Sequence, residues 1–230
     1  MKSLKLISLI LIISILLPYG ASAHVEQFEQ NPATAIDETA LIAYLSSNPA
    51  TARIVVDGVE IDSGNGELIS AIIGTDGKCE ATYGFRLSHM DRGIIIEDGY
   101  DGAGASYVTI SICFNTSYYN NVPIHLLTSV SGSWAVQDPY VSVTDVVVDY
   151  CCTGGGPDGH LVNNQHSHDN HPPVYLGGFS YNTGYTSYIV ELLGTLGAKM
   201  TLSYLMGTSR TWSFEIDCYR LNNTPWLGIY

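Results

Sequence analysis

Histidines gather in one segment of the chain, residues 153–173, and imidazole is a side chain well suited to hold a transition metal. The segment contains four of the seven histidines in the sequence, namely His160, His166, His168 and His171. His166 and His168 are two positions apart, so in an extended backbone both rings would project to the same side and reach one ion. His171, together with Asp169 or His160, would complete a zinc or copper site.

The same segment also fits a simpler description, a polar, glycine-rich surface loop whose histidines titrate freely. It has about twenty residues, and a loop longer than about 12–15 residues is usually functional or mobile. A histidine-rich tract is a compositional signal. Metal binding by this loop is therefore a hypothesis, and the plain surface loop is its alternative.

His24 carries a second chemical hypothesis. Residues 1–23 have the parts of a secretory signal peptide: a positive start, an apolar run over residues 6–17, and an Ala-Ser-Ala cleavage site. Cleavage would leave His24 as the first residue, where the α-amino group and the ring can chelate copper together. With one more histidine this would be a histidine brace, which resembles the copper chemistry of lytic polysaccharide monooxygenases and implies a copper-dependent oxidative enzyme.

Calcium is a weaker candidate for a bound ion. Glu97, Asp98 and Asp101 cluster in a glycine-rich stretch, and calcium prefers oxygen ligands. The spacing is not that of an EF-hand, so a solvated turn is the favoured interpretation.

The five cysteines all follow the predicted signal peptide, and in an oxidising compartment most of them should be paired. Because five is an odd number, we expect two disulfide bonds and one free thiol, with the partners left open. Acceptor sequons begin at Asn115 and Asn222, so an exported chain is predicted to be a glycoprotein if its source glycosylates such proteins.

The elements that must position these residues are mostly strands. A capping-box spacing at Thr34 favours one helix that runs to Ser47. From Ala52 onward the hydrophobic period is two, and Asp57-Gly58 predicts a two-residue turn of the primed type. About a dozen short strands follow, which predicts an all-β protein, a two-sheet β-sandwich or jelly roll with one short N-terminal helix. One domain should cover residues 24–230.

The composition of the chain disfavours some classes of function. The chain of 230 residues has 9 basic and 22 acidic side chains and a formal net charge of -13, which disfavours nucleic-acid binding. No second apolar run is long enough to span a membrane. Sixteen tyrosines, many near Ser, Gly and Asn, are typical of recognition surfaces.

We therefore expect a secreted, extracellular or cell-surface protein with a binding or structural role. It should recognise glycans or partner subunits and hold a metal ion, zinc or copper, in the histidine loop. The alternative is the copper enzyme built on His24.

Overall fold

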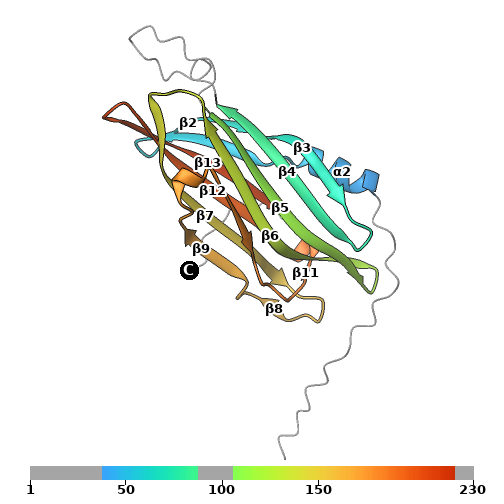
Figure 1. Ribbon diagram of the computed structural model, residues 1–230. Helices are drawn as coiled ribbons and strands as arrows, with labels where there is room; N and C mark the ends of the chain where they lie inside the picture. The colour runs from blue at the N-terminus through green and yellow to red at the C-terminus, as the bar shows by residue number, and fades with distance from the viewer. Residues whose placement is uncertain (1–37, 88–105, 221–230) are drawn as a thin grey trace, which may run out of the picture. The chain divides into compact units, whose positions relative to one another are not determined.

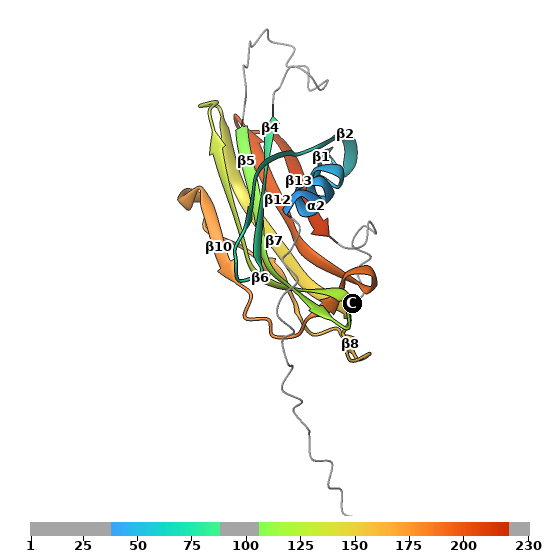
Figure 2. The same ribbon diagram turned by 90° about the vertical axis from the view of Figure 1, so that its right-hand side faces the viewer.

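The computed structural model describes residues 38–87 and 106–220 (Figure 1). One short helix, α2 (Glu38–Ser47), precedes a series of antiparallel strands that form two sheets. Figure 2 shows the two sheets as separate layers packed against each other. The predicted all-β sandwich with one short helix is confirmed, whereas the predicted start of the helix at Thr34 lies outside the described residues.

The first layer, sheet A, has seven strands. In spatial order these are β2 (Val59–Asn65), β1 (Thr51–Val56), β13 (Arg210–Arg220), β12 (Gly194–Met206), β7 (Val141–Gly155) and β8 (Leu161–Val162), and β9 (His166–Asn170) also pairs with β7. The histidine segment therefore adds its strands to one edge of this sheet.

The second layer, sheet B, has six strands. In spatial order these are β10 (Gly178–Asn182), β6 (Val122–Val136), β5 (Ser106–Tyr119), β4 (Lys78–Leu87) and β3 (Glu67–Ile73), and β11 (Ile189–Val190) also pairs with β6. Two short 3-10 helices, η1 (Val174–Leu176) and η2 (Glu191–Leu193), connect strands near the end of the chain.

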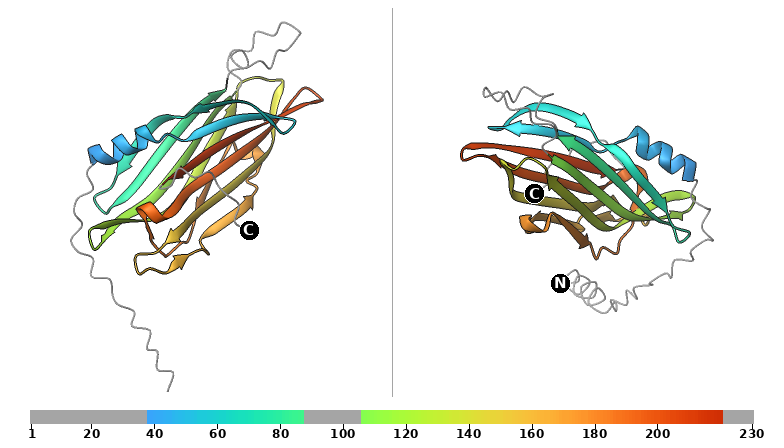
Figure 3. Two further views of the ribbon diagram at one scale, coloured as in Figure 1. Left: turned by 180° about the vertical axis from the view of Figure 1, so that it is seen from behind. Right: turned by 45° about the horizontal axis from the view of Figure 1, so that its top comes forward.

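Alternating apolar residues explain why these segments are strands with one face inside. On β4, Tyr83 and Phe85 are buried, and on β13, Phe214 and Ile216 are buried, as the period-two pattern predicts. The helix α2 lies beside β3 (Figure 3), and the backbone carbonyl of Leu45 accepts a hydrogen bond from the Tyr83 hydroxyl at 3.1 Å.

The hairpin between β1 and β2 turns at Asp57 and Gly58. Both residues have positive φ, 50° and 77°, the conformation that a primed two-residue turn requires. This prediction is confirmed. No helix among residues 38–87 and 106–220 is long and apolar enough to cross a membrane.

The expected long loop at residues 153–173 is corrected by the structure. β7 continues to Gly155, and β8 and β9 both lie within the segment. β9 pairs with β7 so that Cys151 lies opposite His166 and Tyr150 opposite Ser167. The segment is therefore part of sheet A, and its side chains take the alternating directions of a strand.

Candidate ligand-binding site and the histidine edge

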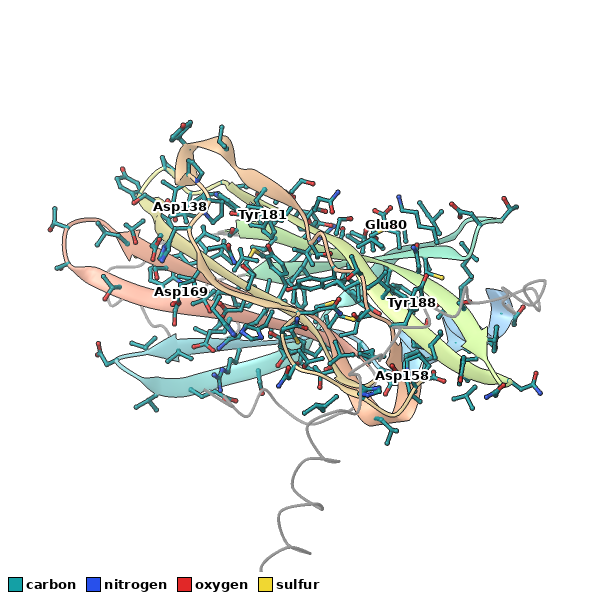
Figure 4. The ribbon with its side chains drawn as sticks, turned by 90° about the horizontal axis from the view of Figure 1, so that it is seen from below. Glu80, Asp138, Asp158, Asp169, Tyr181 and Tyr188 are labelled. Carbon is teal, nitrogen blue, oxygen red and sulfur yellow. The ribbon has the colours of Figure 1, made fainter. Side chains whose placement is uncertain are left out.

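The histidines of residues 153–173 do not converge on one point. His160 lies in an exposed turn, where its Nδ1 is 2.9 Å from Asp158 Oδ2. The backbone N–H of His160 also donates to Asp158, and this hydrogen bond lowers the pKa of the carboxyl group. Asp158 and Asp169 are well separated in Figure 4, so the turn at His160 is remote from the end of β9.

Two of the remaining histidines, His168 and His171, face separate carboxylates of β7. His171 Nδ1 lies 2.9 Å from Asp145 Oδ1, and this hydrogen bond raises the pKa of His171. His168 Nδ1 lies 3.8 Å from Asp149 Oδ1. Asp149 also accepts a hydrogen bond from the backbone N–H of Asp169 at 2.8 Å. His168 and His171 thus each lie beside a different carboxylate of the neighbouring strand.

The predicted metal-binding loop is wrong. His166 and His168 are neighbours, with ring centroids 5.0 Å apart, but no third ligand joins them. Among the residues that the structure describes, no group of three or more His, Cys, Asp or Glu side chains could hold a metal ion. The reason is the pairing of β9 with β7, which spreads the histidines along a sheet edge.

Two further predicted ion sites fall on other parts of the chain. His24, and with it the copper brace, lies outside the described residues, as do the signal peptide and the acidic cluster from Glu97 to Asp101. Secretion and the oxidative copper enzyme stay predictions from the sequence.

The predicted disulfide bonds are also wrong. All five cysteines are free and buried. Cys151 and Cys152 are consecutive on β7, so their side chains point to opposite faces of the sheet. The Sγ atoms lie near carbonyl oxygens, that of Cys151 3.8 Å from Thr195 O and that of Cys152 3.8 Å from His125 O. Burial raises the pKa of the Cys151 thiol to about 12 and that of the Cys152 thiol to about 11.

The predicted glycosylation finds no support either. Asn115 lies inside β5, half-buried, opposite Lys78 of β4 on one side and Leu126 of β6 on the other. An acceptor asparagine is normally found on a surface loop. The second sequon, at Asn222, lies outside the described residues.

Gln165 is a buried amide that no sequence pattern singled out. Its Nε2 donates to Cys152 O (3.1 Å) and Ser187 O (2.7 Å), and its Oε1 accepts from the N–H groups of Thr186 (2.8 Å) and Ser187 (2.7 Å). All four hydrogen-bonding positions of the amide are therefore used. This side chain ties the start of β9 to both β7 and the segment before β11.

His125, on β6, is the buried histidine of the described part of the chain. Its Nδ1 lies 2.9 Å from Thr116 Oγ1, and with the hydroxyl as donor the ring proton is on Nε2. Nε2 has no hydrogen-bond partner among the described residues and lies 4.0 Å from Glu191 Oε1. Burial lowers the pKa of His125 to about 4 and raises that of Glu191, so at neutral pH the ring is uncharged.

Tyrosines of the last third of the chain form a packed cluster. Tyr150 stacks on Tyr181 with ring centroids 6.0 Å apart and contacts Tyr185 at 6.1 Å. Phe179 continues the row beside Tyr181 at 5.2 Å, and the Tyr185 hydroxyl donates to Tyr150 O at 3.2 Å. Burial raises the pKa of Tyr185. These rings fill space between the two layers, the ordinary role of half-buried tyrosine in a sheet.

A pocket of about 230 Å³ opens where the chain crosses from sheet A to sheet B. The crossing is made by the last residue of β2 and the first of β3, and it is fixed by a hydrogen bond from Gly66 N to Ala50 O at 2.7 Å. The floor of the pocket is apolar and includes Ala52, Phe85 and Phe214. The two phenylalanine rings meet edge to face with centroids 5.9 Å apart.

The rim of the pocket is polar. It carries an amide, a carboxylate, a guanidinium and a phenol, contributed by Asn65, Glu67, Arg86 and Tyr107. None of these four side chains has a hydrogen-bond or ion-pair partner among residues 38–87 and 106–220. An apolar floor with several uncommitted polar groups around it is the usual construction of a small-ligand site.

Sequence reasoning did not predict this pocket, although it predicted that Phe85 and Phe214 face inward. Its walls come from β1, β4, β5 and β13, which are far apart along the chain, and none of these segments has a chemical motif of its own. The one local signal is the Gly64-Asn65-Gly66 interruption between two apolar runs.

No family model matches the chain, and comparison with curated proteins and with solved structures found no similar protein. The class of protein is therefore defined by its own geometry, an antiparallel two-sheet sandwich with an amphipathic pocket at the crossing between its sheets.

Proposed function

We propose that the protein is a binding module that recognises a sugar ring in the pocket at the β2–β3 crossing. The observation that carries this proposal is the combination of an apolar floor, built on Phe85 and Phe214, with four polar side chains at the rim that have no partner among the described residues. A pyranose ring has the matching character, with C–H groups on its faces and hydroxyl groups around its edge. Stacking on the floor and hydrogen bonding at the rim would act together.

The rim offers the hydrogen-bonding groups that sugar hydroxyls need. The Glu67 carboxylate only accepts, the Arg86 guanidinium only donates, and the amide of Asn65 and the phenol of Tyr107 do both. A hydroxyl group donates one hydrogen bond and accepts others, so it can bridge such groups. A volume of about 230 Å³ lies below the ~300–1,000 Å³ of sites for drug-sized molecules, which favours a single ring.

Binding is favoured over glycoside hydrolysis by the number of carboxylates. Glycosidases of the common kind place two Asp or Glu side chains around the scissile bond. Among the described residues, Glu67 is the one acidic residue that lines this pocket. The described part of the site therefore has the groups to hold a sugar, and a second carboxylate for cleavage is not among them.

Calorimetric titration with monosaccharides and their methyl glycosides tests the proposal. Arg86→Ala should weaken binding about tenfold to a hundredfold, because a hydrogen bond from a charged group is worth about 1.5–3 kcal/mol. Arg53→Ala is the matched control, since Arg53 pairs with Glu215 at 2.6 Å on the outer face of sheet A. The proposal fails if no sugar binds, or if both variants bind as the unaltered protein does.

A further inference from the structure

Gly84 leaves a gap in the outer face of sheet B, beside the rim of the pocket. On β4 the side chains of Tyr83 and Phe85 are buried between the two sheets, so a side chain at Gly84 would point to the outer face. Gly84 also lines the pocket, and the strands β4, β5 and β6 lie side by side in sheet B (Figure 1). A ligand that extends out of the pocket therefore reaches the outer face of sheet B across Gly84.

The phenol ring of Tyr107 lies over this gap. Tyr107 is on β5, opposite Arg86 of β4, which is two residues beyond Gly84. A Cβ at Gly84 would lie 2.7 Å from the Tyr107 hydroxyl oxygen and 2.5 Å from Ile69 Cδ1. Because the hydroxyl reaches the backbone of the neighbouring strand, the ring runs along the surface of the sheet instead of standing out from it. Tyr107 is half-buried, as expected for a ring with one face on the sheet and the other face outward.

Small side chains adjoin the Tyr107 ring on the side of β6. Ala135 lies opposite Tyr107 and is exposed. The next outward-facing pair along β5 and β6 is Thr109 and Ser133, whose hydroxyl oxygens are 2.7 Å apart. An alanine methyl is too short to cover a neighbouring ring, and each hydroxyl can form further hydrogen bonds. Among the described residues, this side of the ring therefore has room for a ligand and polar groups to hold it.

We propose that the outward face of Tyr107 is the platform for a second sugar ring, and that the ligand is a glycan chain of two or more residues. This inference rests on the sugar site proposed above. The end residue of the chain occupies the pocket, whose volume of about 230 Å³ favours one ring. The next residue stacks its C–H face on Tyr107, because a phenol ring offers a flat apolar face. Later residues pass over Ala135 towards the hydroxyl groups of Thr109 and Ser133.

Calorimetric titration with sugars of increasing length tests the platform. Glucose, cellobiose and cellotriose form one series, and the oligomers of N-acetylglucosamine, mannose and galactose form the others. In a series that binds, the disaccharide should bind about fivefold to tenfold more tightly than the monosaccharide, because the second ring buries apolar surface on Tyr107. Tyr107→Ala should remove most of this gain, and Tyr107→Phe, which retains the ring, should keep it. Tyr175→Ala is the matched control, since Tyr175 is 83 % exposed and lies in η1, and should keep both affinities.

Gly84→Ala tests the platform without removing the tyrosine. The added methyl group would meet the free ends of the Tyr107 and Ile69 side chains, and these ends can turn aside. The variant should therefore fold, which thermal unfolding checks, but its Tyr107 ring can no longer lie down on the sheet. We expect the ratio of disaccharide affinity to monosaccharide affinity to fall in Gly84→Ala as it falls in Tyr107→Ala.

The platform and the pocket fail in different ways. Equal affinities for monosaccharide and disaccharide in every series that binds would overturn the platform and leave the sugar site in the pocket standing. A disaccharide gain that survives Tyr107→Ala would also overturn the platform, because the second ring would then be held elsewhere. If no member of any series binds, the sugar site itself is wrong, and the platform is wrong with it.

Discussion

The imidazole of His125 is enclosed by the sandwich, and that enclosure determines its response to pH. Burial lowers its pKa from 6.5 in the unfolded chain to about 4 in the folded one. Between these values the unfolded chain binds more protons, so this group contributes stability that is present above pH 6.5 and is lost as the pH falls towards 4. The full loss is about 3 kcal/mol.

Urea unfolding at a series of pH values measures this effect. The free energy of unfolding should fall between pH 6.5 and 4, and the fall should be smaller in His125→Gln, whose side chain does not titrate. Equal slopes for the two proteins would mean that His125 is hydrated or charged in the folded state, contrary to its burial.

Gln165 fixes the start of β9 through four hydrogen bonds. Gln165→Ala would leave the N–H groups of Thr186 and Ser187 without their acceptor and remove both donors from Cys152 O and Ser187 O. We expect a loss of about 2–4 kcal/mol in unfolding free energy, since each buried group left unpaired costs about 1–3 kcal/mol and neighbouring effects are not additive. Gln137→Ala, at an exposed position, should change stability by less than about 0.5 kcal/mol.

At the scale of elements, the contact of β7 with β12 depends on Gly154. This residue has a φ of +149°, and a Cβ added there would overlap Gly194 Cα and the backbone carbonyl oxygen of Leu193. Backbone atoms of a paired strand cannot move aside as a side chain can. Gly154→Ala should therefore destabilise the sandwich by about 3 kcal/mol or more, or prevent folding.

Gly159→Ala is a control that introduces backbone strain without a steric clash of the added Cβ. Gly159 has a φ of +83° but open space where a Cβ would lie, so the substitution should cost only about 1–2 kcal/mol. Thermal unfolding of the two variants compares the effects. Similar melting temperatures would argue against the close approach of β7 and β12.

The strands and the hairpin whose formation depends on neighbouring residues could be predicted from the sequence. The period-two alternation of β4 and β13 and the Asp57-Gly58 turn were sufficient for their strands and hairpin. β8 and β9 had no such signal, because β9 is polar throughout, and its extended form comes from pairing with β7 and from the Gln165 amide. For the same reason, the spacing of His166 and His168 did not reveal that His168 and His171 face different carboxylates of β7.

At the scale of the whole molecule, the pocket could not be predicted at all. Ala52, Phe85 and Phe214 come from three strands in two sheets, and only the packing of one sheet on the other brings them together. Asn65 and Glu67 look like ordinary polar residues of a crossing in the sequence. That they have no partner within residues 38–87 and 106–220 is visible only once the surrounding side chains are placed.

Because the pocket has walls in both sheets, a molecule bound in it would contact both sheets at once. Ala52 and Phe214 belong to one sheet and Phe85 and Tyr107 to the other, so the sheets cannot separate without releasing the ligand. A sugar present at a hundred times its dissociation constant should add about 2.7 kcal/mol to the unfolding free energy. Melting temperature would then report occupancy of the site, and the size of the shift at a known sugar concentration would measure the affinity for that sugar.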